Sequence, residues 1–543
     1  MTQPSPIAPQ EPSEAPAEAE AQEAKTPEQV NPFFRRVARL PQGPDSYMKL
    51  AIMFFALAMI TVLHFMPAEW FPVAKPIGAS KEVAALSTAG KDAIAILLFA
   101  IILWVSEALP FPITALLVLL AASSLRVCSF GRAVELGFGH PVIMFFVGVL
   151  LMAASVTHSG VGARITFFIL RHVGSSAKGV ILGFLCVSAL LAMWTSTLGG
   201  AAMSTPLAYA ILRQLDIKPL RSNFGRALMI ACSWGALFGG VATPAGSGPN
   251  PLAIGFLHDL AGIDISFLDW MKYGVPAMLL MIPVGWGLLL WLFPLEIKRL
   301  PVSVEQVERE MKRLGPVTAR ELYTMFVFVT TIFLWVAKPL IEGWTGGVVK
   351  PTTHTVALLG GALLFVPKVA VFHWKDVQKE IDWGGVILIA GGLCIGRLLA
   401  DTGAANWLAR MLLGRLDSVP TAMRLPVVIL AVHVLHLAFS SNSVTGAIVI
   451  PLLVALARDL NMNPWILCGP AAFTCSQAFV LVTETPTNVI PYSTGYFKLT
   501  DFAKAGVVMT LLATLCLWAA MAAVEAIIGA PVPSFAPAAA PGL

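Results

Sequence analysis

Two short stretches place hydroxyl side chains, glycine and a carboxamide in the middle of long apolar segments. The first, "MWTSTLGGAAMSTPL", contains Ser196 and Thr197, and the second, "FSSNSVTGAIVIPL", contains Ser441, Asn442 and Ser443. A proline follows ten residues after Ser196 and again ten residues after Ser441. Neutral hydroxyl and carboxamide groups can donate hydrogen bonds to an anion without the cost of burying a fixed charge. The two stretches therefore predict a paired site for a small anion.

A second pair of interrupted apolar segments follows these stretches along the chain. "GGVATPAGSGPNPLAIGF" carries Thr243 and a proline before Asn250, and "VLVTETPTNVIPYSTGYF" carries Thr485 and Pro486 before Asn488. Proline and glycine leave backbone groups without helical partners, and such groups are tolerated at membrane depth only around a polar cavity or ligand. Small residues in membrane helices also mediate close packing. Four interrupted segments arranged as two matched pairs nevertheless favour a binding site.

The elements that must position these residues are membrane helices. Of the 543 residues, 57% are hydrophobic and only 12% are charged, and the mean hydropathy is +0.78. Apolar runs close to the length that crosses a bilayer core recur along the chain, and they are apolar on all sides rather than at alternating residues. The sequence thus predicts an all-α polytopic membrane protein with about 11 transmembrane helices and two re-entrant hairpins.

Charge and cysteine usage argue against several other classes of protein. The net charge is +5, but the basic residues cluster at helix ends rather than on one face, so no nucleic-acid partner is expected. The seven cysteines lie singly in apolar context, which favours free buried thiols over disulfides or metal ligands. Arg35, Arg36, Arg39 and Lys49 precede the first apolar run, and this predicts a cytoplasmic N-terminus.

The order of these segments predicts two membrane halves built on the same plan. Repeats with broken hydrophobic segments at matching positions are typical of secondary transporters, whose sites lie where helix N-termini meet at the repeat interface. The predicted segments are a disordered cytoplasmic tail (1–45), a first half (46–292) with a hairpin (179–212) and a broken helix (227–260), a cytoplasmic amphipathic linker (293–321), a second half (322–528) with a hairpin (425–456) and a broken helix (465–496), and a disordered tail (529–543).

These motifs resemble those of the divalent anion/sodium symporter (DASS) family over about Leu50 to Val524. The hairpin tips are similar to the paired Ser-Asn-Thr motifs of that family, and "TETPTNVIPYSTGYFKLTDFAKAG" is the most specific match. The resemblance implies an inverted repeat in an elevator-type homodimer, with scaffold and transport domains, in the cytoplasmic (inner) cell membrane. It implies transport of dicarboxylates, tricarboxylates or sulfate, Na⁺ as the candidate coupling ion, no other cofactor, and no enzymatic activity.

The resemblance also assigns binding residues by position. The substrate contacts that it implies are Ser196, Thr197, Thr243, Ser441, Asn442, Ser443, Thr485 and Pro486. The cation contacts that it implies, beside each tip and on the facing loop, are Ser196, Thr197, Ala242, Ser440, Asn442 and Glu484.

Several positions depart from the pattern of the family. Leu198 stands where the first tip usually has a hydroxyl, and Ala192 and Leu437 stand where sodium-coupled members often carry one, four residues before each tip serine. Sodium takes hard oxygen ligands, so we expect sodium dependence to be weakened or replaced by exchange or proton coupling. Glu484 stands where a small residue is usual, and it could coordinate a cation, carry a proton, or pair with a nearby lysine or arginine.

The leading functional hypothesis is a transporter of small organic dianions, namely C4-dicarboxylates such as succinate or malate. A sulfate or sulfonate transporter of the same fold is the alternative, because Leu198 narrows the first tip. An integral membrane enzyme acting on a lipid or isoprenoid is more remote. Such an enzyme needs an acid/base or metal constellation, and the sequence has no HxxxH motif, paired Asp-rich run or phosphate-binding glycine loop.

Overall fold

The computed structural model describes residues 44–74, 85–299 and 312–528. The predicted tail at 529–543 lies outside these ranges, and so do nearly all of the predicted tail at 1–45 and the middle of the predicted linker. The chain divides into two units, Met1–Ala51 and Ile52–Leu543. Helix α2 (Pro44–Phe65) begins in the first unit, and the elements described below belong to the second.

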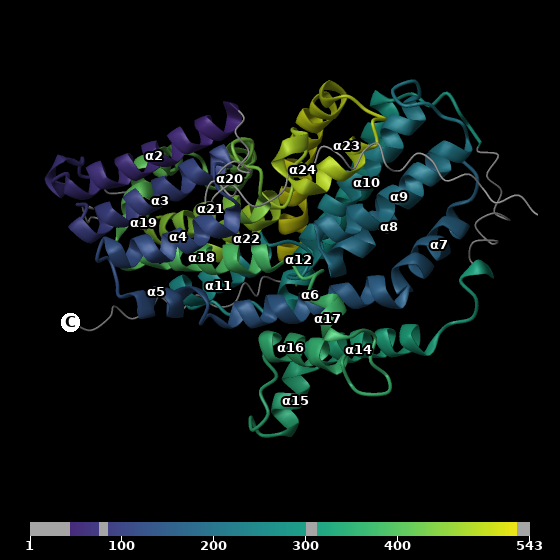
Figure 1. Cartoon of the computed structure of the whole chain (residues 1–543), viewed down its shortest axis with the longest axis horizontal. Helices are drawn as coiled ribbons and strands as arrows, with labels where there is room; N and C mark the ends of the chain where they lie inside the picture. The colour runs from purple at the N-terminus through teal and green to yellow at the C-terminus, as the bar shows by residue number, and fades with distance from the viewer. Residues whose placement is uncertain (1–43, 75–84, 300–311, 529–543) are drawn as a thin grey trace, which may run out of the picture. The chain divides into compact units, whose positions relative to one another are not determined.

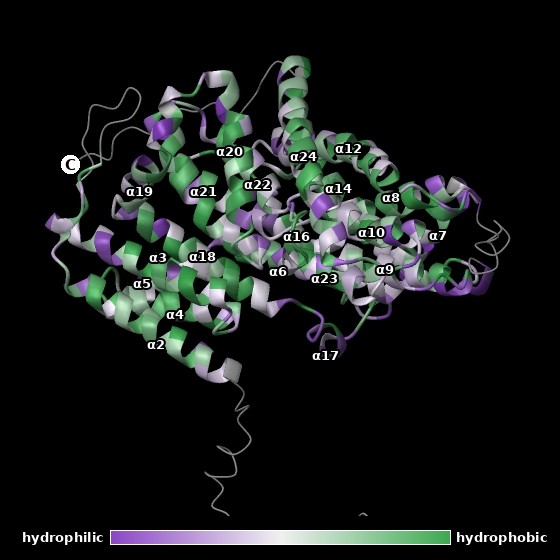
Figure 2. Cartoon of the chain, turned by 90° about the horizontal axis from the view of Figure 1, so that it is seen from above, coloured by the Kyte–Doolittle hydropathy of each residue, from purple (hydrophilic) through white to green (hydrophobic). Residues whose placement is uncertain are grey.

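All regular elements in the described ranges are helical, and ten of these helices are long and apolar enough to cross a membrane. A bent pair, Ala404–Leu416 with Thr421–His436, would make an eleventh span. These numbers confirm the predicted all-α membrane fold with about 11 spans. Figure 2 shows hydrophobic residues along most of the helices and hydrophilic residues mainly at helix ends and in the connections between helices.

The first hairpin consists of α8 (Ala177–Thr195) and α9 (Thr197–Gln214), with Ser196 alone between them. Helix α8 begins where the Ser176 hydroxyl accepts a hydrogen bond from the backbone N–H of Gly179 at 2.9 Å. Helix α9 folds back and packs along α8 (Figure 1). The predicted hairpin therefore has its break at the predicted serine.

The first broken helix follows as α10 (Asn223–Ala242) and α11 (Pro249–Ala261), joined by residues 243–248, which we call the first loop. Helix α10 is buried along nearly its whole length and packs on α8 and α9. The approach to α8 is close enough to require glycine, since a Cβ at Gly239 would lie 2.0 Å from the carbonyl oxygen of Ala189. The first loop is thereby held against the first hairpin.

The second half repeats this order of elements. Its hairpin consists of α20 (Thr421–His436) and α21 (Asn442–Asp459), and its broken helix consists of α22 (Pro464–Cys475), the turn η3 (Val482–Glu484) and α23 (Pro486–Ser493). Helix α21 packs on α11 of the first half and on α22, and α23 packs on α9 and α10. The two halves therefore interlock through their broken helices.

Three further helices, which we call the wall helices, bring side chains to the same region: α4 (Phe111–Ser124), α6 (Pro141–Ser159) and α18 (Trp383–Asp401). Helix α18 packs on α4, α11 and α21, and α16 packs on α6. The remaining described elements are η1 (Ala68–Trp70), α3 (Thr88–Ser106), α5 (Phe130–Gly137), α7 (Val161–Val173), α12 (Phe267–Leu292), α14 (Ala319–Val336), α15 (Lys338–Trp344), α16 (Thr353–Leu363), α17 (Trp374–Val377), α19 (Ala404–Leu413), η2 (Gly414–Ser418) and α24 (Leu499–Ile528).

Candidate functional site

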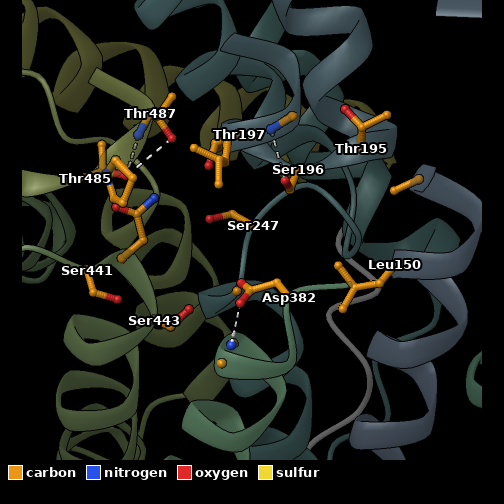
Figure 3. Close-up of a pocket in the computed structure, with 18 of the residues that line it drawn as sticks. Leu150, Thr195, Ser196, Thr197, Ser247, Asp382, Ser441, Ser443, Thr485 and Thr487 are labelled. Atoms are coloured by element: carbon orange, nitrogen blue, oxygen red, sulfur yellow. Dashed lines mark hydrogen bonds between the residues drawn. The ribbon is translucent and has the colours of Figure 1, made fainter. Parts of the chain in front are cut away.

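Both hairpin tips, both broken helices and the wall helices enclose a cavity of about 620 Å³. We call Ser196–Leu198 the first tip, Ser440–Ser443 the second tip, and residues 476–485 the second loop. Figure 3 shows Ser196, Ser247 and Ser441 around the same space, although these serines come from different elements. Segments far apart in the sequence thus place hydroxyl groups at one site.

The first tip combines a strained backbone with a fixed hydroxyl. Ser196 has a φ of 90°, in a region that residues other than glycine rarely adopt. Its Oγ accepts a hydrogen bond from the N–H of Gly199 at 3.3 Å and so caps α9. The N–H of Thr197 donates to the carbonyl oxygen of Gly246 at 3.0 Å. The first tip and the first loop are therefore joined through their backbones.

The second tip presents a carboxamide at the start of α21. The side chain of Asn442 lies beside the buried His436, whose imidazole can donate a hydrogen bond to Oδ1. Asn442 also lines the cavity, so a ligand or cation there would compete with His436 for this oxygen. The first loop also touches this tip, because a Cβ at Gly248 would lie 2.0 Å from Oγ of Ser443.

The electrostatics of the cavity come from neutral groups on one side and acids on the other. Helices α9, α21 and α23 begin at the cavity, and helix N-termini attract anions. Among the described lining residues, the ionisable side chains are Glu380 and Asp382 (Figure 3 labels Asp382). Asp382 accepts from the N–H of Gly385 at 2.8 Å, and Glu380 lies 2.8 Å from Nε2 of His158. No lysine or arginine is among these lining residues.

The two loops have a common register that the Thr-Pro pairs do not reveal. The N–H of Asn250 donates to the carbonyl of Ser247 at 3.1 Å, and the N–H of Asn488 donates to the carbonyl of Thr485 at the same distance. Ser247 and Thr485 therefore occupy equivalent positions, three residues before each asparagine, and both line the cavity. Pairing Thr243 with Thr485, as the sequence pattern suggests, is out of register.

The predicted substrate contacts gather at the cavity with one exception. Thr243 is fully buried away from the lining, and its Oγ1 donates to the carbonyl of Met193 at 2.5 Å. It therefore supports the first hairpin from behind. The predicted contacts that line the cavity are Ser196, Thr197, Ser441, Asn442, Ser443, Thr485 and Pro486.

The predicted cation contacts divide in the same way. Ser440 lines the cavity together with the tip residues, whereas Ala242 is buried at the end of α10 and Glu484 is buried within the second loop. Oε1 of Glu484 accepts a hydrogen bond from the N–H of Leu481 at 2.9 Å. Within the described ranges Glu484 forms no ion pair with a lysine or arginine. Its carboxylate closes the turn rather than lining the cavity.

Sequence reasoning missed three kinds of lining residue: a loop hydroxyl, an apolar residue of a wall helix and an acidic N-cap. Ser247 would have been found by counting back from Asn250, because the interval from serine or threonine to asparagine is the same in both halves. Leu150 of α6 gave no signal, since an apolar residue on an apolar helix is equally compatible with lipid or with a protein neighbour. Asp382 begins α18 as its N-cap, and its sequence context is that of any helix start.

Comparison with known proteins relates the chain to membrane transporters. The family described as "Sodium:sulfate symporter transmembrane region" matches residues 53–528. The sodium-dependent dicarboxylate transporter SdcS of Staphylococcus saprophyticus is 28% identical over 444 residues, which are 79% of this chain and 84% of the relative. An uncharacterized transporter of Haemophilus influenzae is 29% identical over 425 residues, covering 77% of this chain and 88% of the relative.

A solved structure has a similar arrangement of helices. MtrF of Neisseria gonorrhoeae, from a class of antimetabolite efflux pumps, has a TM-score of 0.51 at 11% identity and covers 90% of this chain and 97% of its own. This likeness concerns the fold alone. The family match spans all of the cavity-lining elements, and we conclude that the chain belongs to the sodium:sulfate symporter (DASS) family of multi-pass membrane transporters.

Proposed function

We propose that this protein is a secondary transporter of small divalent organic anions, C4-dicarboxylates such as succinate and malate, in the cytoplasmic membrane. The observation that carries the proposal is the cavity, where both tips and three helix N-termini present neutral donors to one space of about 620 Å³. The sodium-dependent dicarboxylate transporters among the relatives support the substrate class. The basic residues before α2 support a cytoplasmic N-terminus.

A bound cation follows from the charge of the lining. A dianion would enter a cavity whose described ionisable residues are both acidic, and an uncompensated buried charge is costly. Cations beside the tips would supply the compensation, with Ser196 and Thr197 on one side and Ser440 and Asn442 on the other. Sodium is the candidate ion, as the relatives are named sodium-dependent.

The sodium dependence should be shallower than in these relatives. Leu198, Ala192 and Leu437 offer no oxygen from their side chains where sodium-coupled members often carry hydroxyls, and each lost ligand weakens a weakly bound monovalent ion. Proton coupling or anion exchange would then carry part of the flux. Transport by an elevator movement of the hairpins and broken helices against the wall helices, within a homodimer, completes the proposal.

The test is uptake by purified protein in liposomes. Saturable succinate or malate uptake, compared side by side under sodium, potassium and proton gradients, should show a dependence on cations with a low sodium Hill coefficient. If neither uptake nor counterflow is detected with any member of a panel of di- and tricarboxylates, the proposed substrate class is wrong. A steep, multi-ion sodium dependence would contradict the weakened coupling.

Sulfate or a sulfonate is the second candidate substrate. Leu198 is 43% exposed on the first tip and lines the cavity, which narrows the space for a longer anion. Competition by sulfate against succinate at equal concentration separates the two candidates. Loss of uptake in Asn442→Ala, with the fold preserved, would favour transport at this site over any enzymatic role.

A further inference from the structure

Two buried asparagines, Asn250 and Asn488, occupy the same position in the two broken helices and are absent from the cavity lining. Each stands near the start of the helix that follows the break, and each side chain is fully buried. Their contacts follow the same pattern in both halves, so their role is not particular to one loop.

Each asparagine closes the loop of its own half. Nδ2 of Asn250 donates to the carbonyl oxygens of Gly240 and Thr243 at 2.8 and 2.7 Å, ten and seven residues earlier. Nδ2 of Asn488 donates to the carbonyl oxygens of Ala478 and Leu481 at 2.7 and 3.1 Å, again ten and seven residues earlier. The break in each helix leaves carbonyls without amide partners, and one carboxamide satisfies two of them.

The Oδ1 atom of each carboxamide accepts a hydrogen bond from the other half of the protein. Oγ of Ser233, on α10, donates to Oδ1 of Asn488 at 2.5 Å. Oγ of Ser476, at the end of α22, donates to Oδ1 of Asn250 at 3.4 Å. Since both N–H groups are already used within each loop, the direction of Oδ1 is fixed. The two halves are therefore joined by a crossed pair of hydrogen bonds.

We propose that Asn250 and Asn488, held by Ser476 and Ser233, are positioning residues that set the two loops relative to each other. The loops carry Ser247 and Thr485 to the cavity, three residues before each asparagine, so the crossed bonds determine the affinity of the anion site. This inference rests on the proposed transport function for its kinetic readout. It makes the two halves of the site mechanically dependent on each other.

The two crossed bonds differ in how their donors are shared, and the difference gives a directional test. The Ser233 hydroxyl donates to Asn488, whereas Ser476 divides its hydroxyl between Asn250 and the carbonyl of Ala472 at 3.2 Å. Loss of the Ser233 hydroxyl should therefore disturb the site more than loss of the Ser476 hydroxyl. Ser188 supplies a matched control, since its hydroxyl is fully buried on α8 but has no partner among the described residues.

The experiment compares Ser233→Ala, Ser476→Ala and Ser188→Ala in liposomes. We expect Ser233→Ala to raise the KM for succinate about tenfold at a nearly unchanged maximal rate, because the variant loses one buried hydrogen bond that positions the second loop. Ser476→Ala should raise the KM less, and Ser188→Ala should leave it unchanged. A KM that stays within about twofold of the parent in Ser233→Ala, while the melting temperature falls, would show a merely structural serine and overturn the proposal.

A second readout needs no substrate and separates this inference from the proposed function. Amide hydrogen exchange in nanodiscs should increase in Ser233→Ala at residues 476–485, in the loop of the opposite half, and not only around α10. If the parent protein transports no dicarboxylate, the proposed function fails but this measurement still decides the inference. If Ser233→Ala does not fold, exchange at residues 243–248 in Ser476→Ala decides it. Exchange changes confined to the mutated helix would refute the crossed coupling.

Discussion

At the scale of single residues, Ser247 and Thr243 stand four positions apart in or beside the same turn but have different surroundings. Ser247 lines the cavity, and its hydroxyl makes no hydrogen bond within the described ranges. Oγ1 of Thr243 donates to the carbonyl of Met193 at 2.5 Å and accepts from the N–H of Ala245 at 3.2 Å. The Ser247 hydroxyl is therefore available to a ligand, whereas the Thr243 hydroxyl stabilises the contact between the first loop and the first hairpin.

Alanine at these two positions should separate binding from stability. Ser247→Ala should raise the KM for succinate about three- to tenfold with an unchanged melting temperature. Thr243→Ala should lower the free energy of unfolding by about 1 to 2 kcal/mol and leave the KM unchanged. Uptake kinetics and thermal unfolding of both variants test this assignment. A larger rise in KM for Thr243→Ala than for Ser247→Ala would restore Thr243 to the site.

At the scale of elements, the sequence predicted which segments meet but not which side of each loop faces the cavity. Serine and asparagine inside apolar runs locate Ser196 and Asn442 at breaks, since polar groups at membrane depth need a reason. Within the first loop there is no helical or strand period to assign an orientation, so the sequence alone does not show that Thr243 faces the first hairpin while Ser247 faces the cavity. The sequence could not predict that Leu150 of α6 lines the cavity, because an apolar side chain suits both a lipid and a protein neighbour.

At the scale of elements, the contact between the first loop and the second tip can be tested by adding a methyl group at Gly248. Gly248 has a φ of −59°, which alanine adopts without strain, but its added Cβ would lie 2.0 Å from Oγ of Ser443. Gly248→Ala should therefore displace the second tip and raise the KM for succinate, at a cost of about 1 to 3 kcal/mol from overpacking. Uptake kinetics at fixed protein density measure the change.

Two further variants identify the cause of that effect. Ser443→Ala removes the clashing oxygen, so the combined Gly248→Ala and Ser443→Ala variant should lose less affinity than the sum of the two single variants. Gly246→Ala is a contrast, because its Cβ would lie 2.6 Å from the backbone carbonyl of Gly240, which cannot rotate away. It should lower the yield of folded protein. Strict additivity of the first pair would contradict a direct contact.

At the scale of the whole molecule, the wall helices hold the first broken helix at one point by polar contacts. Nε2 of His140, the N-cap of α6, lies 3.3 Å from Oδ2 of Asp259 on α11. Nη1 of Arg397 on α18 donates to the backbone carbonyl of Asp259 at 3.0 Å, and its Nε donates to Asp401 at 2.8 Å. If α11 moves against α6 and α18 during transport, these bonds exist in one conformation and are broken in another.

Removing the carboxylate of Asp259 should therefore change the ratio of the two transport conformations without changing the anion site. Asp259→Ala leaves the backbone bond to Arg397 in place and deletes only the partner of His140. Loss of a half-buried bond of about 1 kcal/mol changes a two-state ratio about fivefold. In a Ser441→Cys background, Asp259→Ala should redistribute labelling by a membrane-impermeant maleimide between the two sides of oriented vesicles. In the protein that retains Ser441, Asp259→Ala should change the KM for succinate little at saturating cation.

The matched control is an ion pair with a similar distance between its charged groups, but with both residues on the same helix. Arg132 and Glu135 lie 2.9 Å apart on α5, exposed and three residues apart. Glu135→Ala removes that pair, and since an exposed pair within one helix has the same partners in every rigid-body arrangement, the labelling ratio should not change. Equal ratios in Asp259→Ala and the parent would mean that α11 keeps its place on α6 throughout transport. In that case the moving boundary must lie elsewhere in the fold.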